Sequence, residues 1–260
     1  MTGEPATAAA PPAEEPRRIV LEVLGLFAIA TVLAAATFQV GRFVAPVGRH
    51  VADIIAVIFY AVPVARLWQR RRDLYDYGFN LKGWRRGALL VAATTLVVFP
   101  LFIVAFVLFY GAVCGPLRDT LGVLAPPNLC RRFAGLGSFH PAWPGGTAWG
   151  TVVAAFTQLV AVALPEEFFF RGYLQGRLGE ALPARRRLLG VPVGRALLLA
   201  AVLFALGHFL IDFDARRLAV FFPAIVFGWL RDATGSIAPG AAFHALCNLF
   251  SDGLHRSFFG

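Results

Sequence analysis

The chain has 260 residues, of which 58% are hydrophobic and 15% are charged, and its formal net charge is +9. A soluble domain averages about 45–50% apolar and about 25% charged residues, so this composition excludes an ordinary soluble protein. Most basic residues lie between long apolar runs. Their positions therefore indicate membrane topology, and no nucleic-acid partner is expected.

In chain order, the sequence predicts an all-α polytopic membrane bundle of about seven transmembrane or half-membrane helices. Residues 1–16 are rich in Ala, Pro and Glu and are expected to form a disordered tail. The run 19–40 could be a signal peptide, but a spanning helix fits better because so many others follow. The predicted helices cover residues 19–40, 51–67, 88–113, 148–170, 196–211, 218–230 and 237–250. The last two are too short to cross at ideal length, so we expect them to be tilted, extended at their ends or partly re-entrant.

Lys and Arg residues are unevenly distributed between these segments. With the N-terminus in the cytoplasm, the inner segments hold 16 of the 24 Lys and Arg residues and the outer segments hold 8. Cytoplasmic segments usually carry this excess, so a cytoplasmic N-terminus is predicted. The loop 114–147 then lies outside, where Cys114 and Cys130 could form a disulfide. Cys247 falls in an apolar helix and is expected to be a small packing residue.

The sequence PEEFFFRGYLQGRL, residues 165–178, places two adjacent carboxylates inside a very apolar part of the chain. Burying a carboxylate without a partner costs several kcal/mol. On a helix, Glu167 and Arg171 are i,i+4 neighbours with the acid N-terminal, which is the favoured orientation for an ion pair. Glu166 lies about 100° away and has no such cation. We therefore expect Glu167 and Arg171 to form a structural ion pair and Glu166 to be the reactive group.

Three polar residues interrupt the later apolar helices. His208 follows Phe204 by one helical turn, and His244 and Asn248 are spaced i,i+4 on one helix face. A single histidine or asparagine in a membrane can simply bridge helices by a hydrogen bond. Together with a carboxylate on a third helix, however, they supply a general base, a proton donor and an oxyanion donor. This combination indicates a site that activates water.

Three motifs carry a resemblance to a known family. EEFFFR (residues 166–171) matches its E-E-x-x-x-R motif, FALGH (204–208) its F-x-x-x-H motif, and HALCN (244–248) its H-x-x-x-N motif. Over roughly residues 148–250 the chain resembles the CAAX protease and bacteriocin-processing family of glutamic intramembrane proteases. This family includes the type II CAAX prenyl endopeptidases. The run 165–178 is also similar to the branch known as myxosortases.

The resemblance implies a role for each polar residue of the motifs. The implied catalytic residues are Glu166, which activates water, His208 and His244, which hold or polarise it, and Asn248, which stabilises the oxyanion. The implied supporting residues are Glu167, Arg171 and Phe204. The resemblance also implies a catalytic helical core, residues 148–260, after N-terminal transmembrane helices and an outer loop, residues 17–147.

Members of this family have also been described as metalloproteases. Glu166, His208 and His244 could form a two-histidine, one-carboxylate metal site. The zinc-protease signature H-E-x-x-H is absent, however, and no second carboxylate is placed to act as base if Glu166 binds a metal. We therefore predict a mechanism without a cofactor and keep zinc as the alternative.

The predicted function is that of an endopeptidase hydrolysing a membrane-anchored protein or peptide, with a CAAX-like or sorting-signal substrate, at the lipid bilayer. One alternative is a non-catalytic immunity or scaffold protein of the same fold. Another is a small-molecule or proton transporter, although no inverted repeat supports it. The Arg- and Ala-rich composition with a single Met is typical of a high-GC bacterium. An integral protein of the bacterial inner (plasma) membrane is therefore expected.

Overall fold

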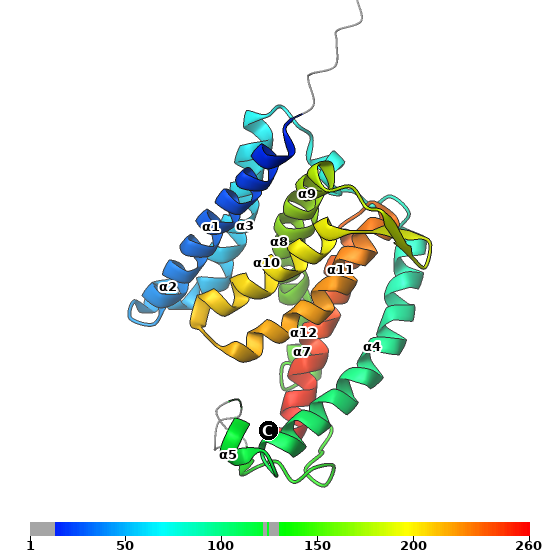
Figure 1. Cartoon of the computed structure of the whole chain (residues 1–260). Coiled ribbons are helices and arrows are strands. Elements are labelled where there is room, and N and C mark those ends of the chain that lie inside the picture. Colours follow the sequence, from blue (N-terminus) through cyan, green and yellow to red (C-terminus); the bar gives the residue numbers. More distant parts are fainter. Residues whose placement is uncertain (1–13, 122–123, 125–129) are drawn as a thin grey trace, which may run out of the picture.

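The computed structural model describes residues 14–121, 124 and 130–260, and its chain runs back and forth through one helical bundle (Figure 1). Within these described residues, five helices are long and apolar enough to cross a membrane. They are α1 (Pro16–Gly41), α3 (Val51–Gln69), α4 (Trp84–Val113), the helix Ala148–Ala181 and α10 (Arg195–Asp212). Two further helices, α11 (Phe221–Thr234) and α12 (Ala238–Phe259), complete the bundle. The predicted all-α membrane fold is confirmed.

Each of the seven predicted helices has a counterpart at nearly the predicted position. The main differences are two longer helices: the helix predicted to end at Phe170 continues to Ala181, and α12 continues beyond Phe250 to Phe259. Of the ways we expected the short segments to be accommodated, extension at the end applies to α12, while α11 keeps 14 residues. Helix α1 begins at Pro16, and Glu14 before it is ion-paired. The rest of the predicted tail, residues 1–13, lies outside the described residues.

The helix Ala148–Ala181 changes its winding along its length. Its consecutive segments are α7 (Ala148–Thr157), the π-helical η3 (Gln158–Ala163), α8 (Leu164–Glu167), the π-helical η4 (Phe168–Gln175) and α9 (Gly176–Ala181). Thr147 caps its start by accepting a 2.9 Å hydrogen bond from the backbone N–H of Gly150. π-Helical turns are rare and are often found at functional sites. Here two of them flank the carboxylate pair Glu166 and Glu167.

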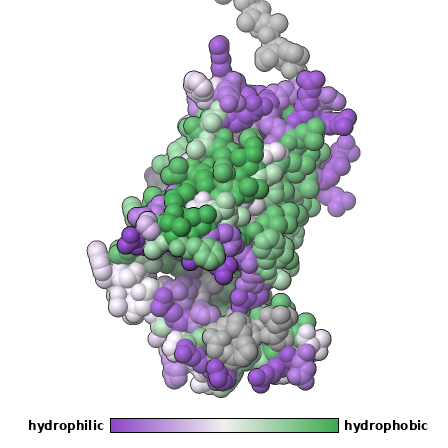
Figure 2. Space-filling view, turned by 90° about the vertical axis from the view of Figure 1, so that its left-hand side faces the viewer, coloured by the Kyte–Doolittle hydropathy of each residue, from purple (hydrophilic) through white to green (hydrophobic). Residues whose placement is uncertain are grey.

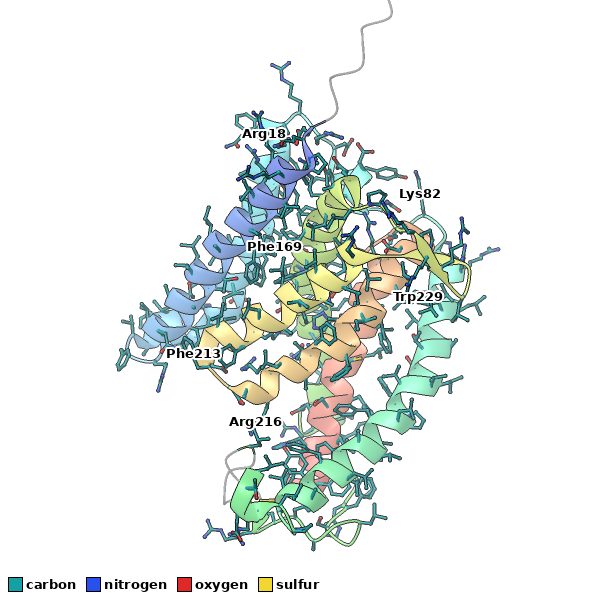
Figure 3. All side chains as sticks on the ribbon, viewed as in Figure 1. Arg18, Lys82, Phe169, Phe213, Arg216 and Trp229 are labelled. Atoms are coloured by element: carbon teal, nitrogen blue, oxygen red, sulfur yellow. A yellow bond between two sulfur atoms is a disulfide. The ribbon has the colours of Figure 1, made fainter. Side chains whose placement is uncertain are left out.

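Three consecutive phenylalanines of this helix lie at the centre of the bundle. Phe168, Phe169 and Phe170 are all buried, and Phe169 is seen among the helices in Figure 3. The Phe169 ring stacks on Phe59 of α3 with 5.1 Å between centroids, and the Phe170 ring meets Phe204 of α10 edge-on at 5.0 Å. Each buried aromatic ring contributes a large apolar area. This packing fixes the height and rotation of the carboxylates one turn away.

Short elements connect the long helices. They are α2 (Ala45–Arg49), η1 (Leu74–Tyr77), α5 (Arg118–Leu121), η5 (Ala215–Val220) and an antiparallel hairpin of β1 (Arg186–Leu188) and β2 (Val191–Val193). The hairpin lies in the basic loop before α10 and was not predicted. Its two turn residues, Leu189 and Gly190, both have positive φ angles, as a tight hairpin turn requires.

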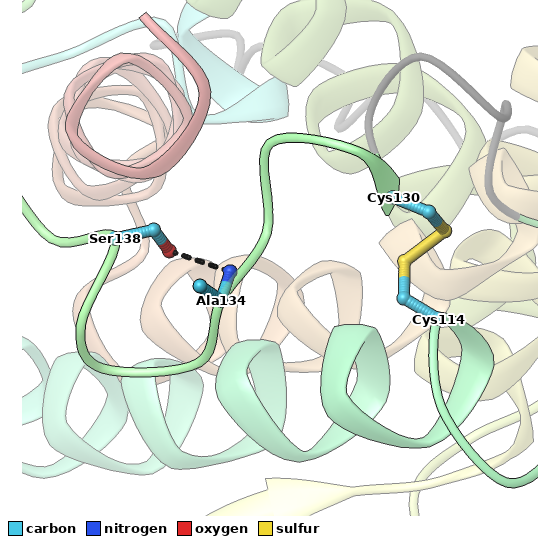
Figure 4. Close-up of a disulfide and its surroundings, with 4 residues drawn as sticks. All are labelled: Cys114, Cys130, Ala134 and Ser138. Atoms are coloured by element: carbon cyan, nitrogen blue, oxygen red, sulfur yellow. Dashed lines mark hydrogen bonds between the residues drawn. A yellow bond between two sulfur atoms is a disulfide. The ribbon is translucent and has the colours of Figure 1, made fainter.

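A disulfide joins Cys114, just after α4, to Cys130 in the long loop (Figure 4). The same loop is held locally by Ser138, whose hydroxyl accepts a hydrogen bond from the backbone N–H of Ala134. Cys247 is a free thiol that packs against the core, as expected. The possible bridge identified in the sequence is therefore present.

The surface is divided by polarity. Figure 2 shows apolar residues over the middle of one face and hydrophilic residues gathered toward both ends. Helix α4 exposes large apolar side chains along its length, among them Leu89, Leu96, Leu101 and Leu108. Such exposure is costly in water and is expected where the solvent is lipid. The chain is accordingly an integral membrane protein.

Candidate active site

Glu167 is held in a fully buried cluster with one cation and one histidine. Its Oε1 atom accepts a 2.8 Å hydrogen bond from Nη1 of Arg171, the predicted i,i+4 partner, and lies 3.1 Å from Nδ1 of His244 on α12. Helix α12 can approach so closely because residue 240 is Gly, and a Cβ there would lie 3.1 Å from Glu167 Oε2. The predicted ion pair is present, and it also orients a histidine.

The buried cation Arg171 has partners besides Glu167. Its Nη2 atom donates a 3.3 Å hydrogen bond to the carbonyl oxygen of Ala224 on α11. Its guanidinium lies 4.1 Å from the ring centroid of Phe204 and 5.0 Å from that of Phe227. A cation over aromatic faces gains most where water is excluded. Phe204 therefore supports the site by contacting its central cation, in addition to its contact with His208.

Glu166, one residue earlier, faces a different set of groups. Its Oε2 atom lies 3.8 Å from Nε2 of His208 on α10 and 3.8 Å from Nε2 of His244 on α12. These separations are too long for direct hydrogen bonds. Oε2 is buried and accepts no hydrogen bond from any residue that the structure describes. Oε2 of Glu167 also lacks a donor among the described residues, but Glu166 is the carboxylate whose free oxygen faces Nε2 of both histidines.

The other ring nitrogen of each histidine determines what Nε2 can do. Nδ1 of His208 lies 2.9 Å from the carbonyl oxygen of Phe204, which can only accept, so Nδ1 must donate. Nδ1 of His244 donates in the same way to the Glu167 carboxylate. In a neutral imidazole the remaining nitrogen then carries a lone pair. Both Nε2 atoms lie 3.8 Å from Glu166 Oε2, so three acceptors converge.

Asn248 follows His244 by one turn of α12 and is held by a residue that the sequence analysis missed. Its Nδ2 atom donates a 2.8 Å hydrogen bond to Oε1 of Gln158, the first residue of η3. An asparagine amide has two N–H donors, so one remains available. The sequence did offer a signal for Gln158, because it is a lone amide side chain in the apolar run that precedes Glu166. No contact among the described residues joins Asn248 directly to Glu166.

A cavity of about 410 Å³ reaches this cluster from one side. Glu166 and His208 form part of its wall, together with apolar residues of α1, α3 and α10. The described residues contain no group of three His, Cys, Asp or Glu side chains arranged to hold a metal ion.

Comparison with known proteins gives one match. Residues 148–250 match the family model described as Rce1-like type II CAAX prenyl endopeptidase. The matched range contains α7 to α11 and α12 as far as Phe250, and therefore all seven residues singled out in the sequence. The match does not distinguish the myxosortase branch. No curated protein and no solved structure matched the chain.

Proposed function

We propose that the chain is an intramembrane endopeptidase in which Glu166 activates water, because residues 148–250 match the family model described as Rce1-like type II CAAX prenyl endopeptidase. The observation that carries this proposal is the convergence at Glu166 Oε2. That atom is buried, lacks a hydrogen-bond donor among the described residues, and faces the Nε2 atoms of His208 and His244 at 3.8 Å each. A water about 2.8 Å from each of these atoms could donate its two hydrogens to two of the three.

The proton count of the site suggests how the groups divide the work. A water has two hydrogens, whereas Glu166 and the two neutral histidines present three acceptors. We therefore assign one additional proton to a histidine. Glu166 then takes a proton from the water as its oxygen attacks the peptide carbonyl carbon, and the imidazolium protonates the amine that leaves.

Asn248 is proposed to stabilise the oxyanion of the tetrahedral intermediate. One of its N–H donors is engaged by Gln158, which fixes the plane of the amide, and the second is free to point at the substrate. Removing one oxyanion donor in other hydrolases costs about 10²–10³ in kcat. Arg171 and Glu167 contribute by holding His244, and Phe204 by accepting from His208.

The metal-free mechanism is preferred because Glu166 is the only carboxylate that faces both histidines in the described structure. If Glu166 bound zinc, no base would remain beside it, since Glu167 is engaged by Arg171 and His244. Activity that survives chelators, in protein without stoichiometric zinc by elemental analysis, would support this choice. Loss of activity on chelation and its return with zinc would contradict it.

The match to this family model is our reason to propose a membrane-anchored polypeptide as substrate. The test is cleavage of such a polypeptide by the purified protein in liposomes, followed by mass spectrometry. Glu166→Gln, His208→Ala and His244→Ala should each abolish cleavage while the protein remains folded. A matched control is Glu180→Gln, which changes a carboxylate at the far end of the same helix. Retained activity in all three site variants would overturn the proposal, and flux of a solute without proteolysis would favour a transporter.

A further inference from the structure

The cavity that ends on Glu166 is a channel between two pairs of helices. Its inner wall includes Phe59, Phe170 and His208, and its outer part is formed by Phe38 at the end of α1 and Ala52 at the start of α3. Between these ends the lining is almost entirely apolar, with small residues such as Ala34 and Ala56 leaving the space. A volume of about 410 Å³ is within the range of pockets that take drug-sized ligands or a few side chains.

Two arginines lie at the outer part of this channel. Arg49 is the last residue of α2, and Arg217 lies in η5, just after α10. Arg217 is ion-paired with Asp212 at 2.6 Å, whereas Arg49 has no ion pair among the described residues. The nearest acid in sequence, Asp53, contacts His50. The channel mouth therefore carries one arginine more than it has carboxylates to balance.

The opposite end of the bundle is closed by a cluster of ion pairs, which we call the N-terminal ion cluster. It comprises Glu14, Glu22, Arg66, Arg70, Tyr173, Arg177 and Glu180. Arg177 within it is fully buried, and Glu22 nearly so. A second cavity of about 200 Å³ near this end is lined by Gln175 and Arg231 and does not include Glu166. Of these two cavities, the channel that passes Arg49 is thus the one through which a substrate could reach Glu166.

The channel mouth lies at the same end of the bundle as the disulfide. Helices α1, α4 and α10 all run from the end of the N-terminal ion cluster toward the end where α2, α5 and η5 lie (Figure 1). Cys114 of the disulfide directly follows α4 at this end. In Figure 3, Phe213 and Arg216 mark this end and Arg18 and Lys82 mark the other. Disulfides persist in oxidising compartments, and the opposite end carries most of the basic residues. Both the disulfide and the distribution of basic residues favour a mouth outside the cytoplasm.

We propose that this channel binds an extended apolar polypeptide segment that enters from the disulfide-bearing end, with a carboxylate of the substrate held by Arg49 and Arg217. This inference rests on the proposed function, because the bound segment must reach Glu166. An arginine fork binds a carboxylate through two parallel hydrogen bonds. The apolar wall accepts neighbouring side chains of the substrate, and the arginines fix the distance between its acidic group and the cleaved bond.

Binding is measured with the full chain in vesicles, in a Glu166→Gln background so that no substrate is consumed. The probe is a fluorescent, membrane-anchored peptide with an apolar run followed by Asp, compared with the same peptide carrying Asn or Lys instead. We expect the Asp peptide to bind about five-fold or more tightly than the Asn peptide. Arg49→Glu should remove this preference and reverse it in favour of Lys. The matched control Arg42→Glu, at the C-cap of α1 and not among the residues that line the cavity, should leave the preference intact.

Two further experiments test whether substrate passes through the channel and whether the arginines bind peptide or lipid. In the wild-type active background, Ala52→Trp should raise KM by filling the channel while kcat for bound substrate changes little, and Arg216→Gln should change neither. Vesicles of neutral and of anionic lipid separate the two sources of an oxyanion. If Arg49→Glu alters binding only in anionic vesicles and irrespective of the peptide's charge, the arginines bind lipid phosphate and the proposal is overturned.

The result also distinguishes this inference from the proposed function. If Glu166→Gln abolishes cleavage but Arg49→Glu and Ala52→Trp change neither peptide preference nor KM, the protease stands and the channel assignment falls. If wild-type protein binds the Asp peptide through Arg49 but Glu166→Gln leaves cleavage unchanged, the assignment of the base falls instead.

Discussion

Two regions of this bundle place carboxylates next to arginines, and they differ in how many of the carboxylate oxygens accept a hydrogen bond. In the N-terminal ion cluster every carboxylate oxygen has a donor. Glu14 and Glu180 each bond Arg177, Glu22 bonds Arg66, and the remaining oxygens are taken by Arg70, Tyr77 and Tyr173. In the candidate active site, Oε2 of Glu166 and Oε2 of Glu167 have no donor among the described residues.

The difference shows how a structural cluster can be told from a reactive one in a membrane protein. An ion cluster that only holds helices together is most stable when each buried acceptor is paired, because an unpaired one costs about 1–3 kcal/mol. A hydrolytic site must instead keep an acceptor for the water it activates. The unpaired oxygen of Glu166, surrounded by two oriented histidines, fits the second description.

Among substitutions in these two regions, the largest effect is expected on the cleavage rate, when Glu166 is replaced. Glu166→Gln removes the proposed base and should lower the cleavage rate by about 10²–10⁴. Thermal unfolding should change little, because Oε2 has no donor to lose. The measurement is cleavage in liposomes together with unfolding followed by circular dichroism. A large drop in the unfolding temperature with activity retained would mean that Glu166 is structural after all.

Glu167→Gln should have the opposite effect, in that its main consequence is a lower free energy of unfolding. It leaves Arg171 buried without a counter-ion, and removing one partner of a buried pair costs about 3–5 kcal/mol. Replacing both partners together, as Glu167→Leu with Arg171→Met, should restore much of the stability but not the activity, since His244 loses its acceptor. If Glu167→Gln were inactive yet fully stable, the roles of the two glutamates would have to be exchanged.

The N-terminal ion cluster gives the matching test at the other end. Glu22→Gln should lower the free energy of unfolding by about 2 kcal/mol, because Arg66 and Arg70 keep only weakened partners. Cleavage per folded molecule should stay the same, since the cluster does not line the channel. Activity is therefore compared after correcting for the folded fraction. A fall in kcat at full folding would show that this cluster is coupled to the site.

The sequence predicted the helices and one ion pair because both depend on local spacing. Membrane-length apolar runs identify spanning helices, and the i,i+4 separation of Glu167 and Arg171 is satisfied wherever the segment is helical. Convergence of His208 and His244 on Glu166 depends on how three helices pack, which spacing along the chain does not encode. Family motifs, rather than periodicity, connected these residues.

Other features needed the structure because their partners are far apart in the chain. Asn248 and Gln158 are 90 residues apart, and Tyr173 and Glu22 are 151 apart. The sequence analysis attributed the arginines of residues 66–86 to topology, which is compatible with their distribution, but Arg66 and Arg70 also bind buried acids. The π-helical turns beside Glu166 likewise arise from packing, since no residue pattern marks them.

A smaller effect on catalysis is expected from Gln158, which holds Asn248 in the candidate active site. Gln158→Leu removes the acceptor that orients Asn248, and one such hydrogen bond contributes about 0.5–1.5 kcal/mol. We expect kcat to fall by roughly three- to ten-fold with KM nearly unchanged, because the oxyanion forms only in the transition state. Gln158→Glu, which keeps an acceptor at the same place, should recover most of kcat. An equal loss in both variants would indicate that Gln158 does not act through Asn248.

The smallest effect concerns Glu14, at the edge of the N-terminal ion cluster. Burial would raise the pKa of its carboxyl, but hydrogen bonds and charge from Arg177 and Arg70 outweigh burial and lower the pKa. A carboxyl whose pKa is lower in the folded state stabilises the fold above its unfolded pKa of about 4.3, and this contribution is lost as pH falls through the folded value. About a third of this side chain is exposed, so solvent screens the contribution to below about 1 kcal/mol. The unfolding temperatures of wild type and Glu14→Gln should therefore differ by a constant small amount near neutral pH and converge in acid, and a difference that grew on acidification would contradict the ion pairing.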